Sequence, residues 1–185
     1  MCEELNLAYE AIPTDFSAEY RATPEWRALN PVGKVPVLID DNLVMFESGA
    51  MVQHLLNRYG NGALEPSPGT PEHALYLQWS WFGEATFARP IGEIVNHKRE
   101  FPDDKAIPTV LAEMADRSAV SLAAVAEATR NSDYLLGDDF TAADIMVGYS
   151  VRLVEALLPD RMTEDIDPYW QRLQARPAFQ RALTV

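Results

Sequence analysis

A segment rich in glycine and proline divides the chain into two parts of different character. Residues 61–70 read Asn-Gly-Ala-Leu-Glu-Pro-Ser-Pro-Gly-Thr, a composition typical of a linker. Before this segment, short helical and strand patterns alternate, and after it the pattern is almost wholly helical. The sequence therefore predicts an α/β unit over residues 1–62, a linker over 63–70 and an all-helical unit over 71–185.

Turn residues separate the first predicted elements of the α/β unit. Residues 7–12 alternate loosely between apolar and polar side chains and stop at Pro13, which predicts a short strand. Thr23-Pro24 has the form of a helix start, with threonine as the N-cap and proline at the first helical position. This helix is predicted to be short, because Asn30-Pro31 ends it.

A hairpin and a second helix complete the predicted α/β unit. Residues 35–39 and 43–46 are apolar and flank the turn Asp40-Asp41-Asn42, so they predict two paired strands. Ser48 is predicted to cap a helix over residues 48–59, which the glycines that follow would stop.

The all-helical part has clear start signals. Thr141-Ala142-Ala143-Asp144 has the form of a capping box ahead of an apolar run, and prolines mark two other helix starts. The predicted helices cover residues 71–98, about 105–130, 141–158, 164–175 and 177–183.

The charge balance and the single cysteine exclude several classes of function. The formal net charge is −13, so the chain repels nucleic-acid backbones and anionic membranes on average, and we expect neither as a partner. No apolar run approaches the ~18 residues of a membrane span. The single cysteine, Cys2, excludes an intramolecular disulfide and a Cys-rich zinc site, and we expect no metal. The acidic residues 1–5 lack the pattern of a signal peptide, which favours a cytoplasmic location.

Residues before the hairpin have the chemistry of a binding site. A cis Val35-Pro36 peptide would turn the Val35 N–H and C=O towards a ligand, although the two residues alone favour an ordinary trans proline at an edge strand. Lys34 is placed to pair with a ligand carboxylate. The alternative is a solvated surface lysine, which is the more common case.

Residues after the hairpin form a second candidate. The N–H groups and dipole at a helix start attract anions, so Ser48 suits a carboxylate. The neighbouring Glu47 carboxylate would pair with an amino group. Together they suit the zwitterionic head of an α-amino acid, although taken alone they favour a plain N-cap beside a solvated glutamate.

The motifs, taken in their order and spacing, resemble those of the cytosolic glutathione S-transferase family, and the resemblance covers essentially the whole chain. They are residues 30–38 (NPVGKVPVL), 46–50 (FESGA), 75–79 (LYLQW), 134–144 (YLLGDDFTAAD) and 175–178 (ARPA). The resemblance implies a thioredoxin-like glutathione-binding domain followed by an all-helical domain. It also implies a homodimer.

The resemblance gives each residue of the two candidate segments an expected role. Val35 would pair its backbone with the cysteinyl part of glutathione, and Pro36 would be the cis proline that presents it. Glu47 and Ser48 would hold the γ-glutamyl head, and Lys34 would approach the glycine carboxylate. A small hydrophobic electrophile would bind against the first long helix, with Trp81, Phe82, Phe87 and Arg89 as candidate contacts.

The resemblance also implies an incomplete N-terminal domain. Residues 2–10 look like the end of the family's first helix and its second strand, so the first strand and most of that helix, about 20 residues by ordinary element lengths, are not in this chain. The Tyr, Ser or Cys that activates the glutathione thiol would be among them. Cys2 is rejected as a substitute, because it matches a late position on the helix. We therefore expect a perturbed sheet, and a start assigned downstream of the true one and a natural truncation both remain open.

Three functions follow from these expectations. The first is a transferase that conjugates glutathione to a small electrophile, whose catalytic residue is not identified. The second is a non-catalytic glutathione-binding or protein-interaction module, since a fold does not fix an activity. The third, a plain helical interaction domain with a vestigial α/β part, predicts no glutathione binding.

Overall fold

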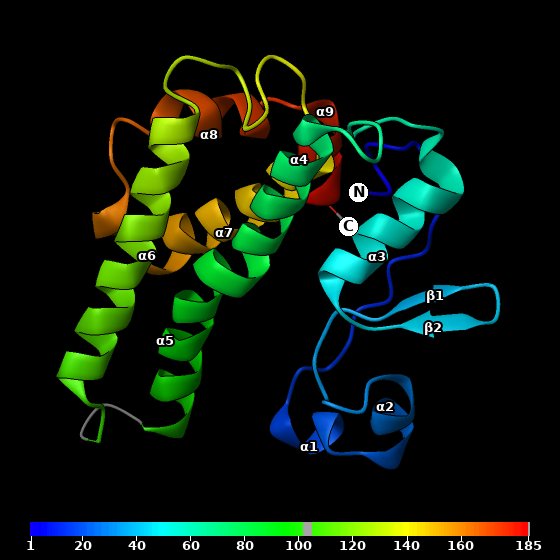
Figure 1. The fold of residues 1–185 in the computed structure, drawn as a ribbon. Helices are drawn as coiled ribbons and strands as arrows, with labels where there is room; N and C mark the ends of the chain where they lie inside the picture. Colours follow the sequence, from blue (N-terminus) through cyan, green and yellow to red (C-terminus); the bar gives the residue numbers. More distant parts are fainter. Residues whose placement is uncertain (102–104, 185) are drawn as a thin grey trace. The chain divides into compact units, whose positions relative to one another are not determined.

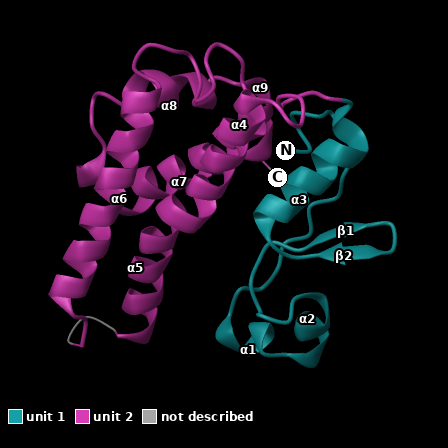
Figure 2. Cartoon of the chain, in the orientation of Figure 1, with its two compact units in different colours: residues 1–61, 185 teal, residues 62–184 magenta. Residues whose placement is uncertain are grey.

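The structure, a computed structural model, describes residues 1–101 and 105–184. These residues form two compact units, unit 1 over residues 1–61 and unit 2 over residues 62–184 (Figure 2). The last residue of the predicted helical range, 185, lies outside the described residues. No helix in the described part of the chain is long and apolar enough to span a membrane.

Unit 1 begins with one isolated helical turn. The Leu5 N–H donates to the Met1 carbonyl at 3.1 Å, and Asn6 ends the turn in the left-handed region with φ of 52°. The prediction of a strand over residues 7–12 is wrong, because these residues have no regular structure. A strand exists only where a neighbouring strand accepts its hydrogen bonds, and no described strand pairs with this segment.

Two short helices follow, and both are capped as their sequences indicate. Helix α1 covers Ala18–Arg21 and helix α2 covers Pro24–Leu29. The Thr23 hydroxyl accepts a hydrogen bond from the Trp26 N–H at 3.2 Å, which confirms the predicted N-cap. The Trp26 side chain is buried in the small core of unit 1.

The sheet of unit 1 has two strands. Strand β1 (Leu38–Asp40) pairs antiparallel with β2 (Leu43–Met45), with Leu38 opposite Met45. The strands are shorter than predicted, since Pro36 has no N–H to donate to a ladder. A two-stranded sheet confirms the expectation of an incomplete sheet for the described residues.

The hairpin leads directly into a helix. Helix α3 covers Ser48–Leu55 and continues as a π-helical turn, η1, over Leu56–Gly60. The prediction of Ser48 as the N-cap is wrong by one residue, because Glu47 is the boundary residue and Ser48 is already helical. The helix continues to Gly60, one residue beyond its predicted end, and Asn61 follows it in the left-handed conformation.

Unit 2 is all helical (Figure 1). Its first rod runs from Pro71 to Glu100, and the predicted start at Pro71 is confirmed. The elements are α4 (Pro71–Trp81), the π-helical segment η2 (Phe82–Ala88), α5 (Arg89–Glu100), α6 (Pro108–Ala128), α7 (Ala142–Leu157), the 3₁₀ turn η3 (Pro159–Arg161), α8 (Asp167–Gln174) and α9 (Pro177–Ala182).

The π-helical segment lies where the first rod crosses α7. Pro90 lacks the N–H that an α-helix would bond one turn earlier, which favours a wider turn before it. A Cβ at Gly83 would lie 2.9 Å from the Met146 carbonyl carbon, so only glycine allows this close approach of the two backbones. The buried Ser150 hydroxyl donates to the Gly83 carbonyl at 2.8 Å and fixes the crossing.

Helix α7 is the centre of unit 2, and a buried carboxylate fixes its start. The predicted capping box is present: Asp144 Oδ2 accepts from the Thr141 N–H at 2.9 Å and from its hydroxyl at 3.1 Å. Asp144 Oδ1 accepts from the Leu135 N–H at 3.0 Å and from the Tyr169 hydroxyl at 3.1 Å. Asp144 is fully buried, and it thereby joins α7 to the loop before it and to α8.

We predict that Asp144→Ala lowers the free energy of unfolding by about 3 kcal/mol or more, because buried donors lose their acceptor. Tyr169→Phe removes only one of these donors and should cost about 1 kcal/mol. Urea unfolding of the two variants beside the wild type measures both values. Equal, small effects would contradict a central role for the Asp144 carboxylate.

Candidate functional site

The candidate residues lie at one end of the β1–β2 hairpin. Lys34, Val35 and Pro36 precede β1, with Val37 between them and the strand. Glu47 and Ser48 follow β2, with Phe46 between. Because Leu38 lies opposite Met45 in the antiparallel register, the chain enters and leaves the hairpin at the same end. The structure therefore brings the two predicted segments to one edge of unit 1.

The turn before β1 is held by one buried side chain. Asn30 is 1% exposed, and its Oδ1 accepts from the Val32 N–H at 3.1 Å while its Nδ2 donates to the Lys34 carbonyl at 2.8 Å. The Gly33 N–H donates to the Asn30 carbonyl at 2.9 Å. These three bonds leave the turn from residue 30 to residue 34 little freedom.

Gly33 has a steric role in the same turn. Its φ is +63°, a conformation that glycine adopts without penalty. A Cβ at this position would lie 2.8 Å from the Arg27 guanidinium carbon and 2.9 Å from the Arg21 carbonyl oxygen. Glycine thus lets α1 and α2 pack closely against the turn that carries Lys34.

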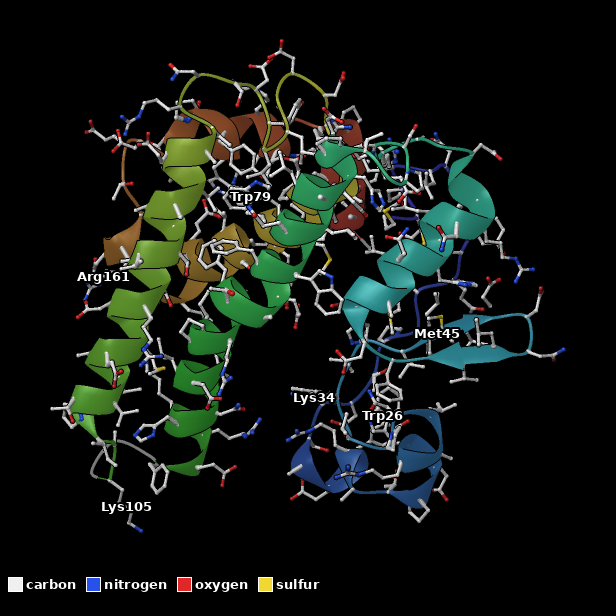
Figure 3. All side chains as sticks on the ribbon, viewed as in Figure 1. Trp26, Lys34, Met45, Trp79, Lys105 and Arg161 are labelled. Carbon is white, nitrogen blue, oxygen red and sulfur yellow. The ribbon has the colours of Figure 1, made fainter. Side chains whose placement is uncertain are left out.

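The residues at the start of the hairpin are accessible to a ligand. Lys34 and Pro36 are exposed, and Val35 is 44% exposed; Figure 3 shows the Lys34 side chain extending from its loop. The Val35–Pro36 peptide is cis, as the family resemblance implies and against the trans form that the two residues alone favour.

Glu47 has an unusual backbone at the other side of the site. Its φ is +77°, a region that costs a non-glycine residue about 1–3 kcal/mol and that clusters at functional sites. Its carbonyl accepts the first hydrogen bond of α3, from the Met51 N–H at 3.0 Å. The Glu47 side chain is exposed, and the half-buried Ser48 is the first helical residue.

A polar cluster fastens the other end of the hairpin to the helix that follows it. Asp40 Oδ2 receives hydrogen bonds from His54 Nε2 at 2.7 Å and from an Arg58 nitrogen at 3.0 Å. Asp40 Oδ1 accepts from the Tyr59 hydroxyl at 2.7 Å, and Arg58 also pairs with Asp41 at 2.6 Å. The bonds from His54 and then Tyr59 hold the pKa of the Asp40 carboxyl below its usual range.

The candidate contacts for an electrophile do not form one surface. Trp81 is 70% exposed, whereas Phe87 is fully buried in the core of unit 2. Phe82 is half-buried and packs edge-on against Trp79, with ring centroids 5.1 Å apart. Arg89 lines a groove between α5 and α6. Phe87 is therefore corrected to a core residue, because its aromatic ring faces inward on the rod.

The single cysteine of the chain is not suited to act as a reactive group. Burial raises the pKa of the Cys2 thiol, so this cysteine is a poor source of thiolate. Among residues 1–101 and 105–184, no group of three or more His, Cys, Asp or Glu side chains is arranged to hold a metal ion.

Sequence reasoning missed the supporting side chains of this site. Asn30 was identified only as a helix end, and Asp40 only as a turn residue. An asparagine four residues before Lys34 in a Pro-Gly turn is a signal that its side chain bonds the backbone locally. No local signal pairs Asp40 with His54 and Tyr59, because these residues meet only in the folded unit.

Comparison with known proteins places this geometry in context. Residues 1–57 match the family model described as "Glutathione S-transferase, N-terminal domain". The chain is 31% identical over 193 residues to glutathione S-transferase 1 of Triticum aestivum, covering 97% of this chain and 84% of that protein. It is 29% identical over 189 residues to glutathione S-transferase 3 of Zea mays, again with 97% and 84% covered.

A solved structure agrees with the fold of this chain. The theta class glutathione S-transferase of Xanthomonas axonopodis pv. citri, crystallised with glutathione bound, is 29% identical and has a TM-score of 0.83. The match covers 100% of this chain and 88% of that chain.

The Asp40 cluster generates a pH-dependent prediction. Because the folded pKa of Asp40 lies below its ordinary value of 3.8, its contribution to stability is present above that value and is lost as the pH falls through the lowered pKa. Asp40→Asn should therefore lower the unfolding free energy at neutral pH, and the difference from the wild type should shrink in acid. Urea unfolding across the acid range measures this difference.

Asp41→Asn is the matched control. Asp41 is exposed and is paired with Arg58 alone among the interactions recorded in the described residues, so its removal should change stability little at any pH. A pH-independent difference between Asp40→Asn and the wild type would contradict the prediction.

Proposed function

Because this chain belongs to the glutathione S-transferase family, we propose that it binds glutathione at the end of the β1–β2 hairpin and transfers it to a small hydrophobic electrophile. The observation that carries the proposal is the meeting of two chemically different segments at one hairpin end. One segment presents an exposed lysine and an exposed valine, Lys34 and Val35, and the other presents Glu47 and the start of α3.

The charges of these groups match the three polar parts of glutathione. Lys34 pairs with the glycine carboxylate, and the Val35 backbone pairs with the cysteinyl peptide groups. The γ-glutamyl carboxylate lies at the first N–H groups of α3, beginning with Ser48, where the helix dipole favours an anion. The Glu47 carboxylate pairs with the γ-glutamyl ammonium, and the left-handed backbone of Glu47 supports this proposal.

The proposed reaction uses the glutathione thiolate as its nucleophile. The thiol loses its proton to a base, and the sulfur lone pair forms a C–S bond to the electrophilic carbon. In a substitution the leaving group departs with its bonding electrons, and in an addition the product carbanion takes a proton from water. The chain's own residues bind and orient glutathione, and none of the described residues is assigned as the base.

A second candidate function is a non-catalytic glutathione-binding module. It is favoured because a fold does not fix an activity and none of the described residues is assigned as the base that activates the thiol. The two functions differ in one measurable property. An enzyme lowers the pKa of the bound glutathione thiol, so the thiolate absorbance of the complex appears at a lower pH than that of free glutathione. A binding module leaves the pKa of the thiol unchanged.

Calorimetric titration with glutathione tests the binding itself. We expect the wild-type chain to bind glutathione. We expect Lys34→Ala to lower the affinity for glutathione by about tenfold or more, since it removes a charge-assisted contact. Lys34→Ala should leave the affinity for the glycine amide of glutathione unchanged, because this ligand lacks the charged glycine carboxylate.

The matched control for Lys34 is Lys98→Ala, which removes an exposed lysine from α5. It should bind both ligands as the wild type does. A folded wild-type chain without affinity for glutathione would overturn the proposed function and would leave the plain helical interaction domain.

We also propose that the protein is a homodimer formed through a groove on unit 2. This groove of about 1100 Å³ lies between α5 and α6. Its walls carry both signs of charge, with Arg89 and Glu93 on one side and Glu113 on the other. Val120 also lines it and is 71% exposed. A second copy related by a twofold axis would place opposite charges together and bury this valine.

Light scattering after size exclusion tests the dimer. The wild type should have twice the 20.7 kDa mass of one chain, and Val120→Glu should shift the population to monomers, because it buries an unpaired charge. Val120→Ala, which adds no charge, is the control and should remain dimeric. A wild-type mass of one chain would contradict the proposal.

A further inference from the structure

The Lys34–Val35 peptide is held from one side by a buried side chain. The Asn30 amide nitrogen donates to the Lys34 carbonyl at 2.8 Å, and Asn30 is 1% exposed. Its amide oxygen accepts from the Val32 N–H at 3.1 Å, so both ends of the amide are engaged and the group cannot turn over without losing two bonds.

This hydrogen bond fixes a group on the opposite side of the peptide. In a planar trans peptide the carbonyl and the following N–H point in opposite directions. The one cis peptide among the described residues is Val35–Pro36, so the Lys34–Val35 peptide is trans. When Asn30 holds the Lys34 carbonyl inward, the Val35 N–H points away from Asn30, on a residue that is 44% exposed.

Close packing at Gly33 is a second constraint on the same turn, and it acts on a different part of the backbone from the Asn30 side chain. Gly33 packs closely against Arg27 and the Arg21 carbonyl, and its N–H bonds the Asn30 carbonyl. The path of the backbone up to Gly33 is therefore set by packing. The orientation of the next peptide plane is set by the Asn30 amide nitrogen, through the recorded bond to the Lys34 carbonyl.

We propose that Asn30 is a positioning residue for glutathione, which aims the Val35 N–H at the cysteinyl carbonyl without touching the ligand. This inference rests on the proposed glutathione site. It gives a buried polar residue a role beyond ending α2, and it separates the residues that contact the ligand from the one that orients them.

The test compares two changes at Asn30. Asn30→Ala removes both amide bonds without changing charge. Asn30→Asp keeps an acceptor for the Val32 N–H, removes the donor to the Lys34 carbonyl and places a negative charge beside that carbonyl. We expect each variant to bind glutathione about tenfold more weakly in calorimetric titration, which is the effect of losing one well-placed hydrogen bond. Urea unfolding establishes that each variant is folded, and Asn30→Asp serves if Asn30→Ala fails to fold.

Asn57→Asp is the control for the added charge. Asn57 is exposed and lies in the same unit, where its Oδ1 accepts from Gln53. This change adds the same negative charge outside the turn and should leave glutathione affinity unchanged.

Amide NMR spectra separate positioning from general loosening. Glutathione should shift the Val35 and Ser48 amide signals of the wild type. In Asn30→Asp at saturating glutathione, the shift at Val35 should be lost while the shift at Ser48 remains. Equal loss at both amides, or wild-type affinity in both Asn30 variants, would overturn the inference and leave the proposed function intact. Absence of glutathione binding by the wild type would overturn the proposed function and, with it, this role for Asn30.

Discussion

Backbone groups that leave water must find hydrogen-bond partners, and this requirement shapes unit 1 more than apolar packing does. Its sheet has two strands of three residues each, so few backbone groups are paired in a ladder. Side chains supply the missing order: Thr23 caps α2, Asn30 closes the turn before β1, and Asp40 fastens the hairpin to the helix after it. Asn30 holds the hairpin end at which the candidate site lies, and Asp40 holds the opposite end.

Unit 2 is stabilised in a different way. Helix α7 buries most of its length, and the rod of α4, η2 and α5 packs against it, so removal of apolar surface from water is its main driving force. Asp144 is the polar exception. Burial raises the pKa of its carboxyl, while the donors from Thr141, Leu135 and Tyr169 favour the charged form. A carboxylate stays charged in a core only when hydrogen-bond donors satisfy its oxygen atoms in this way.

Local signals in the sequence predicted those parts of the fold that depend on local chemistry. Helix starts at Thr23-Pro24 and Pro71, and the capping box at Asp144, follow from side chains that bond or shape their own first turn. The prediction of a strand over residues 7–12 was wrong, because a strand needs a neighbouring strand that its own sequence does not specify. The left-handed backbone of Glu47 also escaped prediction, since glutamate has no preference for that conformation.

The candidate site also has features that the sequence predicts and features that depend on the folded chain. Family motifs indicate which residues face glutathione, and the roles of Lys34, Val35, Pro36, Glu47 and Ser48 stay predictions. What the residues alone did not reveal is how the backbone between them is oriented. The family resemblance implied the cis Val35–Pro36 peptide. The Asn30 bonds and the φ of Glu47 are visible only in the folded chain, because each depends on several residues at once.

For the proposed function, the orientation of these groups matters because the net charge of the chain opposes an anionic ligand. Glutathione has two carboxylates and one ammonium group at neutral pH, and the chain has a formal net charge of −13, so their average interaction is repulsive. Salt screens charges beyond about 8 Å at physiological ionic strength, which leaves contacts at short range to decide binding. In the turn before β1, the Arg27 guanidinium lies close to Gly33, and the exposed Lys34 is the next residue. Under the proposed function, a rigid turn that carries a cation on an acidic protein would select an anion by geometry, and the bonds that make the turn rigid would be part of its specificity.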